Sequence, residues 1–483
     1  NITPSLKLTG TLNTDFGETE VDARQINLDR FNIRFPEKRS FFLEDVGVFD
    51  FASTGPQPPG GAPSAGADVF PFFSRRIGLF DGQEVPLDVG VKLTGKVANT
   101  DIGILGVQTG STIIGESGDN PRQIDDNTFY VGRFKQRIFE LSYVGGIFTD
   151  GNSDPSRSGN TYGADVRLQT SNFMGDNGNF ILDGYALKSD NEGVSDDDLS
   201  YGFSARYPND KWDGMIVFRE IQDNFNPGIG FVQRDNVRMY RVAGSYNPRP
   251  RDFLDIQQMF HDVYYTYFEN LDTGEKESTQ FYITPLDWHF NSGDSIHALI
   301  DYERRYERLF EPWAIVRANP DLGRSAIVLP AGEYRMHRSK MVFATARKRP
   351  LSANFTFGYG DFWSGTSEDV SLSAVYNFPP HITLSLRANQ TFAHLPEGDF
   401  ITRIFTGTFN FAVTPRLTFS NLVQYDNNSR NMGWQSRVRW TLRPGNDLFI
   451  SFNQGWISDP FSAGRFVAQD TNIAGKLQYT FRF

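Results

Sequence analysis

Gly475-Lys476-Leu477-Gln478-Tyr479-Thr480-Phe481-Arg482-Phe483, the last stretch of the chain, decides the fold. Side chains alternate with period two in a strand, so Leu477, Tyr479, Phe481 and Phe483 share one face. The residues between them are all polar and share the other face. The ending therefore predicts a strand with an aromatic face toward an apolar surrounding and a polar face toward water.

This ending resembles the C-terminal assembly signal of bacterial outer-membrane β-barrels, a closing strand that ends in an aromatic residue. Upstream strands should then alternate in the same way, with lipid outside and water inside. In Trp434 to Arg443, Trp and Leu share the predicted outer face, and Gln, Thr and Arg share the inner one. Ile401 to Val413 alternates similarly, with Arg403 as the exception. A dry core would not accept such polar side chains without partners, whereas a wet lumen would.

The composition fits the same interpretation. The 483 residues include 44 Phe and 19 Tyr, as aromatic girdles require. Yet the mean hydropathy is −0.43, and no run approaches the ~20 apolar residues of a membrane helix. The chain has no Cys, which excludes disulfides and thiolate metal sites, and its net charge of −11 argues against nucleic acid as a partner. It starts at Asn1 and shows no signal peptide, so we interpret it as a processed or trimmed form.

The turns and strands predict one all-β domain over residues 1–483, an up-and-down transmembrane barrel. Residues 2–13 form the first predicted strand, and short Pro- or Gly-containing turns alternate with longer loops, the last of them at 457–472. This pattern gives about 22 strands. If Arg24 to Phe35 is a strand and Pro36 turns a hairpin, the count becomes about 24. Either even number places both termini on the periplasmic side.

Six motifs stand out along the chain. They are Phe35-Pro36-Glu37-Lys38-Arg39-Ser40-Phe41-Phe42-Leu43-Glu44, Phe72-Phe73-Ser74-Arg75-Arg76-Ile77-Gly78, Lys92 to Lys96, Gly106 to Thr109, Phe225 to Arg234 and Leu329 to Tyr334. These motifs, of which the first two are the more specific, resemble an uncharacterised bacterial barrel family known as domain of unknown function 5916, whose members often follow a family 9-like carbohydrate-binding domain. The resemblance spans nearly the whole chain, and it implies a barrel and no established activity.

Residues 37–78 form the strongest candidate for a functional segment. This insert is irregular and rich in Pro and Gly, and it carries the cations Lys38, Arg39, Arg75 and Arg76. Folded into the lumen, it would be a plug or constriction whose cations select anionic solutes. The alternative is an extracellular loop whose arginines pair with nearby carboxylates, among them Glu37.

Arg437, Arg439 and Arg443 form a second candidate, an inward basic column on one strand. It could serve as an electrostatic ladder for anions. The alternative is ion pairing with facing carboxylates, which a chain of net charge −11 can supply. No metal ion and no cofactor is expected.

Catalysis is not expected either. The six histidines are scattered, and no G-x-S-x-G, HExxH or P-loop motif occurs. The leading hypothesis is an outer-membrane conduit for a polar solute, porin-like and constricted by the N-terminal insert. The alternative is a non-conducting anchor or scaffold for a periplasmic or surface partner in a larger complex. The expected partners are outer-membrane lipid, lipopolysaccharide and the barrel-assembly machinery.

Overall fold

The computed structural model describes residues 5–14, 22–52, 69–114, 121–175, 177–320, 323–458 and 465–479. One large antiparallel sheet dominates it. None of the described helices is long and apolar enough to cross a membrane. The strands of this sheet are β1 (Leu6–Thr14), β5 (Leu87–Val97), β6 (Thr100–Thr109), β9 (Asn127–Arg137), β10 (Tyr143–Asp150), β11 (Gly159–Phe173), β12 (Gly178–Asn191), β13 (Leu199–Pro208), β14 (Trp212–Ile221), β16 (Val237–Tyr246), β17 (Ile256–Met259), β18 (His261–Asn270), β19 (Lys276–Ile283), β20 (Leu286–Phe290), β21 (Ser295–Leu309), β24 (Gly332–Ala344), β25 (Leu351–Phe362), β26 (Gly365–Phe378), β27 (Ile382–His394), β28 (Phe400–Thr414), β29 (Leu417–Asp426), β30 (Asn431–Arg443), β31 (Asn446–Ser458) and β32 (Phe466–Gln478).

The smaller elements lie between these strands. Four two-stranded pairs form outside the large sheet, β2 with β15, β3 with β4, β7 with β8, and β22 with β23. These elements are β2 (Val69–Phe70), β3 (Leu79–Phe80), β4 (Gln83–Glu84), β7 (Thr112–Ile114), β8 (Arg122–Ile124), β15 (Phe231–Val232), β22 (Trp313–Val316) and β23 (Ile327–Leu329), with the helix α1 (Ser40–Leu43) and the 3-10 turns η1 (Val46–Phe49) and η3 (Ser74–Arg76).

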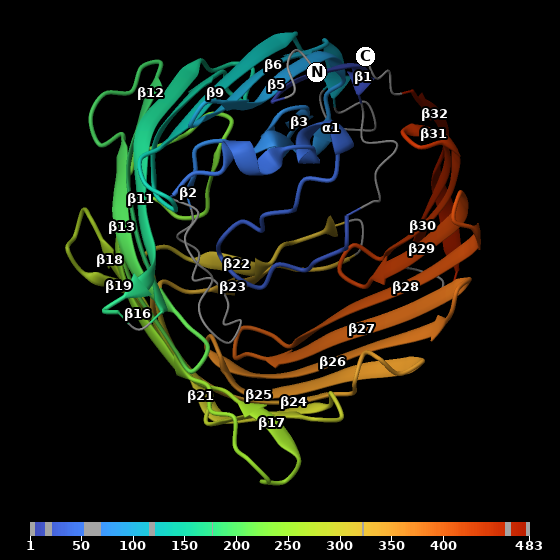
Figure 1. The fold of residues 1–483 in the computed structure, drawn as a ribbon. Coiled ribbons are helices and arrows are strands. Elements are labelled where there is room, and N and C mark those ends of the chain that lie inside the picture. Colours follow the sequence, from blue (N-terminus) through green and yellow to red (C-terminus); the bar gives the residue numbers. More distant parts are fainter. Residues whose placement is uncertain are drawn as a thin grey trace.

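The large sheet contains 24 strands, each antiparallel to its neighbours. Because β17 and β20 only extend β18 and β19, these strands occupy 22 positions, from β1 at one end to β32 at the other. The sheet curves until β32 comes back toward β1 (Figure 1). The described residues include no ladder between β1 and β32. The all-β class and the large antiparallel sheet are thus confirmed.

The start of β1 and the end of β32 lie at the same rim of the sheet. Leu6 pairs with Gly95 beside the turn at 98–99, and Gln478 pairs with Asp447 beside the turn at 444–445. These short turns share one rim because the antiparallel hairpins alternate in direction. The opposite rim carries longer connections, such as 222–236 and 310–331.

Outward positions along the strands are apolar and exposed. On β30, Trp434, Trp440 and Leu442 are exposed on the face predicted from alternation. Arg437 lies on the opposite, inner face, opposite Ser420 of β29 and Ser451 of β31. The period-two pattern therefore predicted the two faces of the C-terminal strands.

Two predicted strands near the N-terminus are wrong. Residues 24–35 form no strand, and no hairpin turns at Pro36, so the count of about 24 through that route fails. Outside a turn at residues 27–31 the segment alternates in exposure, but its polar groups bond to side chains of the large sheet, here called the wall, and form no ladder with it among the described residues. The predicted loop at 457–472 is also too long, since β31 ends at Ser458 and β32 begins at Phe466.

The described parts of residues 37–78 lie inside the ring (Figure 1). Phe41, Phe42 and Phe49 pack with inward side chains of β5, β6 and β9, including Leu105 and Val131. A neighbouring cluster joins residues 51, 52 and 69 of the insert to strands β10, β12 and β14. Where the insert covers the inner face of β5–β14, apolar side chains are removed from water, and buried polar groups such as Lys92 and Arg133 bond to backbone carbonyls of the insert.

Candidate ligand cavity

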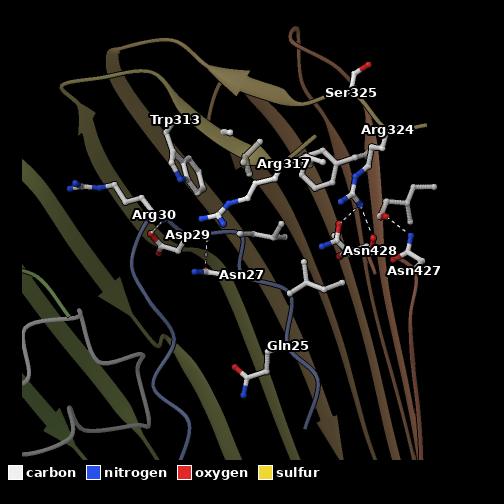
Figure 2. A pocket seen from close by; sticks show the side chains of 18 of the residues that line it. Gln25, Asn27, Asp29, Arg30, Trp313, Arg317, Arg324, Ser325, Asn427 and Asn428 are labelled. Atoms are coloured by element: carbon white, nitrogen blue, oxygen red, sulfur yellow. Dashed lines mark hydrogen bonds between the residues drawn. The ribbon is translucent and has the colours of Figure 1, made fainter. Parts of the chain in front are cut away.

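A cavity lies between the N-terminal segment, residues 22–36, and the opposite wall. Its volume is about 660 Å³, which is within the range of small-molecule sites. It is lined by residues 25–30 and 32 of the N-terminal segment, by 313–317 and 323–325 around β22 and β23, and by 400–402, 427, 428 and 430 at the ends of β28–β30. Figure 2 shows these three groups of side chains facing one another.

The N-terminal segment is fixed to β29 at one end of the cavity. Arg24 Nη1 lies 2.5 Å from Asp426 Oδ2, and the Arg24 backbone N–H donates to Gln424 Oε1 at 2.9 Å. Further along, Asn27 Nδ2 donates to the carbonyl of Phe31 at 2.7 Å, and Asn27 Oδ1 accepts from the N–H of Asp29 at 3.0 Å. These local bonds fold residues 27–31 into a turn, as Asn side chains often do.

A buried charge network fixes the other end of the segment. Arg30 Nη2 lies 2.5 Å from Glu277 Oε1 and 3.3 Å from Glu307 Oε2. Arg234 Nη2 lies 2.8 Å from the same Glu277 oxygen. Arg305 bridges Asp29 and Glu307, at 2.9 Å from each. Paired and hydrogen-bonded charges of this kind can remain buried, and they hold the segment across the interior.

Aromatic side chains form one wall of the cavity. Trp313 lies with its ring centroid 5.1 Å from that of Trp363, which contacts Tyr334 edge-on at 5.5 Å. Leu28 and Phe400 pack against the same cluster. This wall offers a flat apolar surface, against which a ring or a sugar face can pack.

The remaining lining is polar and mostly cationic. Among the described residues, four arginines but one carboxylate, Asp29, line the cavity. Arg324 donates to Asn428 through Nη1, and its buried Nε has no hydrogen-bond partner among the described residues. Arg317 reaches toward the turn of Asn27 and Asp29 in Figure 2. With the amides of Gln25, Asn27, Asn32, Asn427 and Asn428, the site suits an anionic, polar ligand.

A second cavity continues along the wall. It has a volume of about 200 Å³ and lies around Arg24, Gln424, Gln435 and Asn453, against β29–β31. Neither of these two cavities is lined by residues of β5–β14 or of the insert.

The predicted cations of the insert are mostly engaged in local contacts. Arg39 is fully buried and donates to Glu37 at 2.7 Å and to the carbonyls of Ser74 and Ile77 at 2.8 Å. Lys38 lies 3.5 Å from Asp22, which also pairs with Arg75. Arg76 is exposed at the end of η3. Thus Lys38 and Arg75 meet at the carboxylate of Asp22, whereas Arg39 joins two parts of the insert to each other.

The predicted basic column lies on β30. Arg437 and Arg439 face inward, and Arg439 Nη2 lies 3.0 Å from Asp447 Oδ2 of β31. Arg443 is exposed beyond a register shift at the end of the strand. None of the three lines the larger cavity.

The predicted assembly signal is described in part. Leu477 belongs to β32 and is exposed, and Tyr479 follows the strand and is exposed too. Phe481 and Phe483 lie outside the described residues.

Sequence reasoning missed the cavity arginines Arg317, Arg324 and Arg430. They come from loops at separate places in the chain, and their convergence depends on how the ring curves. One usable signal was the length of the 307–332 loop, since long loops often carry function.

The fold and the cavity define a class, namely a large barrel-shaped antiparallel sheet with a folded insert and a ligand-sized polar cavity inside. Residues 1–54 match the family described as Domain of unknown function (DUF5916). The wider resemblance to that family stays a prediction. The sequence matches no curated protein.

Several solved structures are similar to the chain. The FrpB iron transporter from Neisseria meningitidis (F5-1 variant) has a TM-score of 0.45 and 10% identity, over 77% of this chain and 75% of that one. A mutant of the ferric enterobactin receptor PfeA from Pseudomonas aeruginosa has a TM-score of 0.38 and 10% identity, over 82% and 69%. The siderophore receptor PirA from Acinetobacter baumannii has 0.37 and 10%, over 82% and 71%. At this level of similarity none of the three carries an argument about this chain.

Proposed function

We propose that this chain is an outer-membrane β-barrel that admits a small anionic polar solute, with its N-terminal insert as the constriction. The observation that carries the proposal is the cavity of about 660 Å³ between residues 25–32 of the N-terminal segment and the wall, lined by four arginines and one carboxylate among the described residues. Guanidinium groups favour carboxylate and phosphate groups, because their N–H donors match two oxygens at once. The role is passage, and no catalytic step is part of it.

The outer surface supports a membrane location. Phe355, Phe357 and Tyr359 of β25 are exposed side by side on the outer face. Leu372 and Tyr376 continue this belt on β26. Continuous apolar surfaces of this kind need lipid or a partner to cover them. Outer-membrane lipid and lipopolysaccharide would cover the belt, and the barrel-assembly machinery would insert the chain.

The orientation follows from the rims. Both described ends of the sheet lie beside the short turns. In bacterial barrels the short turns are periplasmic and the longer loops are outside. The proposal therefore places both termini on the periplasmic side and the loop containing β22 and β23 on the outside.

Selectivity in this proposal comes from charge and hydrogen bonding at the cavity. Arg317 and Arg430 have no side-chain partner among the described residues, so their donors can serve a solute. The amides of Asn27 and Asn428 add neutral donors and acceptors. The aromatic wall around Trp313 gives an anionic solute with an apolar ring a second point of contact.

The test is the ion selectivity of the purified protein in a planar bilayer. We expect anion selectivity from the reversal potential in a salt gradient, and a several-fold drop in the anion-to-cation ratio for Arg317→Ala with Arg430→Ala. Arg157→Ala is the control, because Arg157 is an exposed loop residue paired with Asp154. An unchanged ratio in the double variant would refute the role of the cavity.

The scaffold alternative is favoured by a different observation. The segments inside the sheet are held to the wall by buried contacts, including the pair of Arg30 with Glu277 and the hydrogen bond from Arg133 Nε to the Asp50 carbonyl of the insert. An insert held this firmly could close the lumen. Deletion of residues 37–78 separates the two functions. Conductance that rises in a folded deletion variant supports the conduit, and silence in both forms leaves the scaffold.

A further inference from the structure

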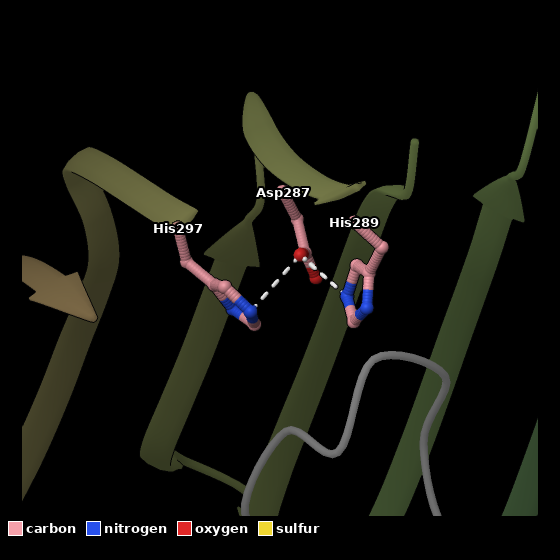
Figure 3. Close-up of side chains that lie close together, drawn as sticks. All are labelled: Asp287, His289 and His297. Carbon is pink, nitrogen blue, oxygen red and sulfur yellow. Dashed lines mark ion pairs between the residues drawn. The ribbon is translucent and has the colours of Figure 1, made fainter. Parts of the chain in front are cut away.

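Three metal-binding side chains converge on the wall at the short-turn rim. Asp287 and His289 belong to β20, and His297 belongs to β21, across the turn at 291–294. Figure 3 shows the three side chains pointing toward one another. Their ligand atoms all lie within 4.8 Å of one another.

The strand geometry explains this convergence. Asp287 and His289 are two residues apart, so they share a face of β20. His297 is the direct cross-strand partner of Asp287, and paired residues share a face as well. On its other side His297 pairs with Val342 of β24. Lys340 and Arg338 lie two and four residues before Val342 and therefore share its face, and Arg338 pairs with Glu303, which points inward. The cluster therefore faces the interior.

The alignment of the three side chains, rather than their distances, favours metal ligands over hydrogen-bonded pairs. Nε2 of His289 and Nε2 of His297 each lie 3.0 Å from Asp287 Oδ1. Neither ring donates a well-aligned hydrogen bond to this oxygen, which is buried and has no hydrogen-bond partner among the described residues. Ligands placed about 2.1 Å from a tetrahedral zinc ion are roughly 3.4 Å apart. A shift of a few tenths of an ångström would thus fit an ion.

We propose that Asp287, His289 and His297 bind a first-row transition-metal dication, a site that is separate from the anionic cavity. Imidazole nitrogens with one carboxylate suit zinc, iron, nickel or copper, whereas calcium and magnesium prefer oxygen ligands alone. Three protein ligands leave coordination positions open toward the interior, since the His289 and His297 side chains are 41% and 27% exposed. Water or a solute donor atom fills these positions.

The surroundings carry charges of both signs. Asp262 of β18 is buried on the inner face, and its strand adjoins β20 through the bond from Phe260 N–H to the Asp287 carbonyl. This second carboxylate favours a cation. Lys340 of β24 faces the same side, and its positive charge disfavours a bound cation. With a dication bound, Asp287 and Asp262 together balance its charge.

The test uses the purified chain without a histidine tag, stripped with a chelator. Zn²⁺ binding is measured by equilibrium dialysis, and Co²⁺ binding by the visible absorption of the coordinated ion. We expect one equivalent of each metal. His297→Ala, His289→Ala and Asp287→Asn should each weaken binding at least tenfold.

The matched control is His394→Ala. His394 Nδ1 lies 3.4 Å from Asp399 Oδ2, but this pair is exposed and has no second histidine among its described contacts. Its variant should bind like the unaltered chain. Each variant is compared only if it shows the same heat-modifiable mobility of the folded barrel, and His297→Gln replaces His297→Ala if the latter fails to fold. Equal loss in the His394 variant, or no stoichiometric binding at all, would overturn the proposal.

Discussion

Arg133 Nη1 lies 2.7 Å from Asp165 Oδ1 and Arg133 Nη2 lies 2.8 Å from Asp165 Oδ2, and both side chains are completely buried. The pair joins the wall strands β9 and β11. It also holds the insert, since Arg133 Nε donates to the Asp50 carbonyl and Asp165 Oδ2 accepts from the Ala52 N–H. One bidentate pair thus connects two wall strands and the insert.

Asp165→Ala should destabilise the protein by about 3–5 kcal/mol, because it leaves a buried guanidinium without its counter-charge. The free energy of unfolding can be measured by urea titration in detergent with tryptophan fluorescence. The control is Arg157→Ala, which removes an exposed side chain paired with Asp154 and should cost about 1 kcal/mol or less. Equal costs for the two variants would show that the buried pair contributes no more than a surface contact.

Glu37 should make the stability of the insert depend on pH. Burial raises the pKa of Glu37, but hydrogen bonds from Arg39 and Ser74 outweigh it, so the pKa is lowered overall. A lowered pKa in the folded state adds stability above the unfolded value of about 4.3, and this stability is lost as pH falls through the folded value. Glu37→Gln should therefore destabilise the protein at pH 7, with a difference that shrinks below pH 4. A difference that is constant with pH would contradict the assignment.

Gly95→Ala should detach β1 from β5. A Cβ at this position would lie 2.0 Å from the Ser5 carbonyl oxygen, and the residue has a φ of +147°, which L side chains rarely adopt. We expect faster amide exchange in residues 6–13, with β25–β28 unchanged. Gly132→Ala is the matched control, since nothing lies within 4 Å of a Cβ there. Protected β1 amides in the Gly95 variant would contradict the steric argument.

Arg24→Ala should loosen the N-terminal segment beside the cavity. The variant removes the contact with Asp426, whose side chain is 8% exposed, and leaves that carboxylate without this partner. Hydrogen exchange of residues 22–28 should accelerate, and the cavity beside this segment should widen. Arg349→Ala at the opposite rim, which removes an exposed pair with Asp294, should leave this exchange unchanged.

The strands of the wall could be predicted from the sequence much better than the segments that lie inside the sheet. On β30 the outward Trp440 and the inward Arg439 follow from period two alone, because lipid and water impose opposite demands on neighbouring residues. Residues 24–35 alternate in the same way, yet their partners are wall residues such as Gln424, 400 positions away. Alternation shows that a backbone is extended, but it does not show whether that backbone joins a ladder.

The candidate sites show the same limit. Asp287 and His289 have the two-residue spacing of one strand face, and His297 follows after a predicted turn, so this cluster was open to prediction from sequence. The pairing of Arg39 with Glu37 was among the alternatives read from sequence, but the pairing of Arg75 with Asp22 depends on how the insert folds back against residues that precede it. Contacts made by irregular segments leave no periodic signal.

The insert packs on one arc of the ring, against β5, β6 and β9–β14, and both cavities lie along the remaining arc. In the proposed conduit the open path therefore lies to one side of the barrel axis. The effect of a substitution should therefore depend on its position around the sheet. Inner-face substitutions on β5 or β6 should alter yield and folding, whereas substitutions near β28–β30 should alter which solutes pass. A saturation screen that scores expression and permeation separately should recover this division from sequence position alone.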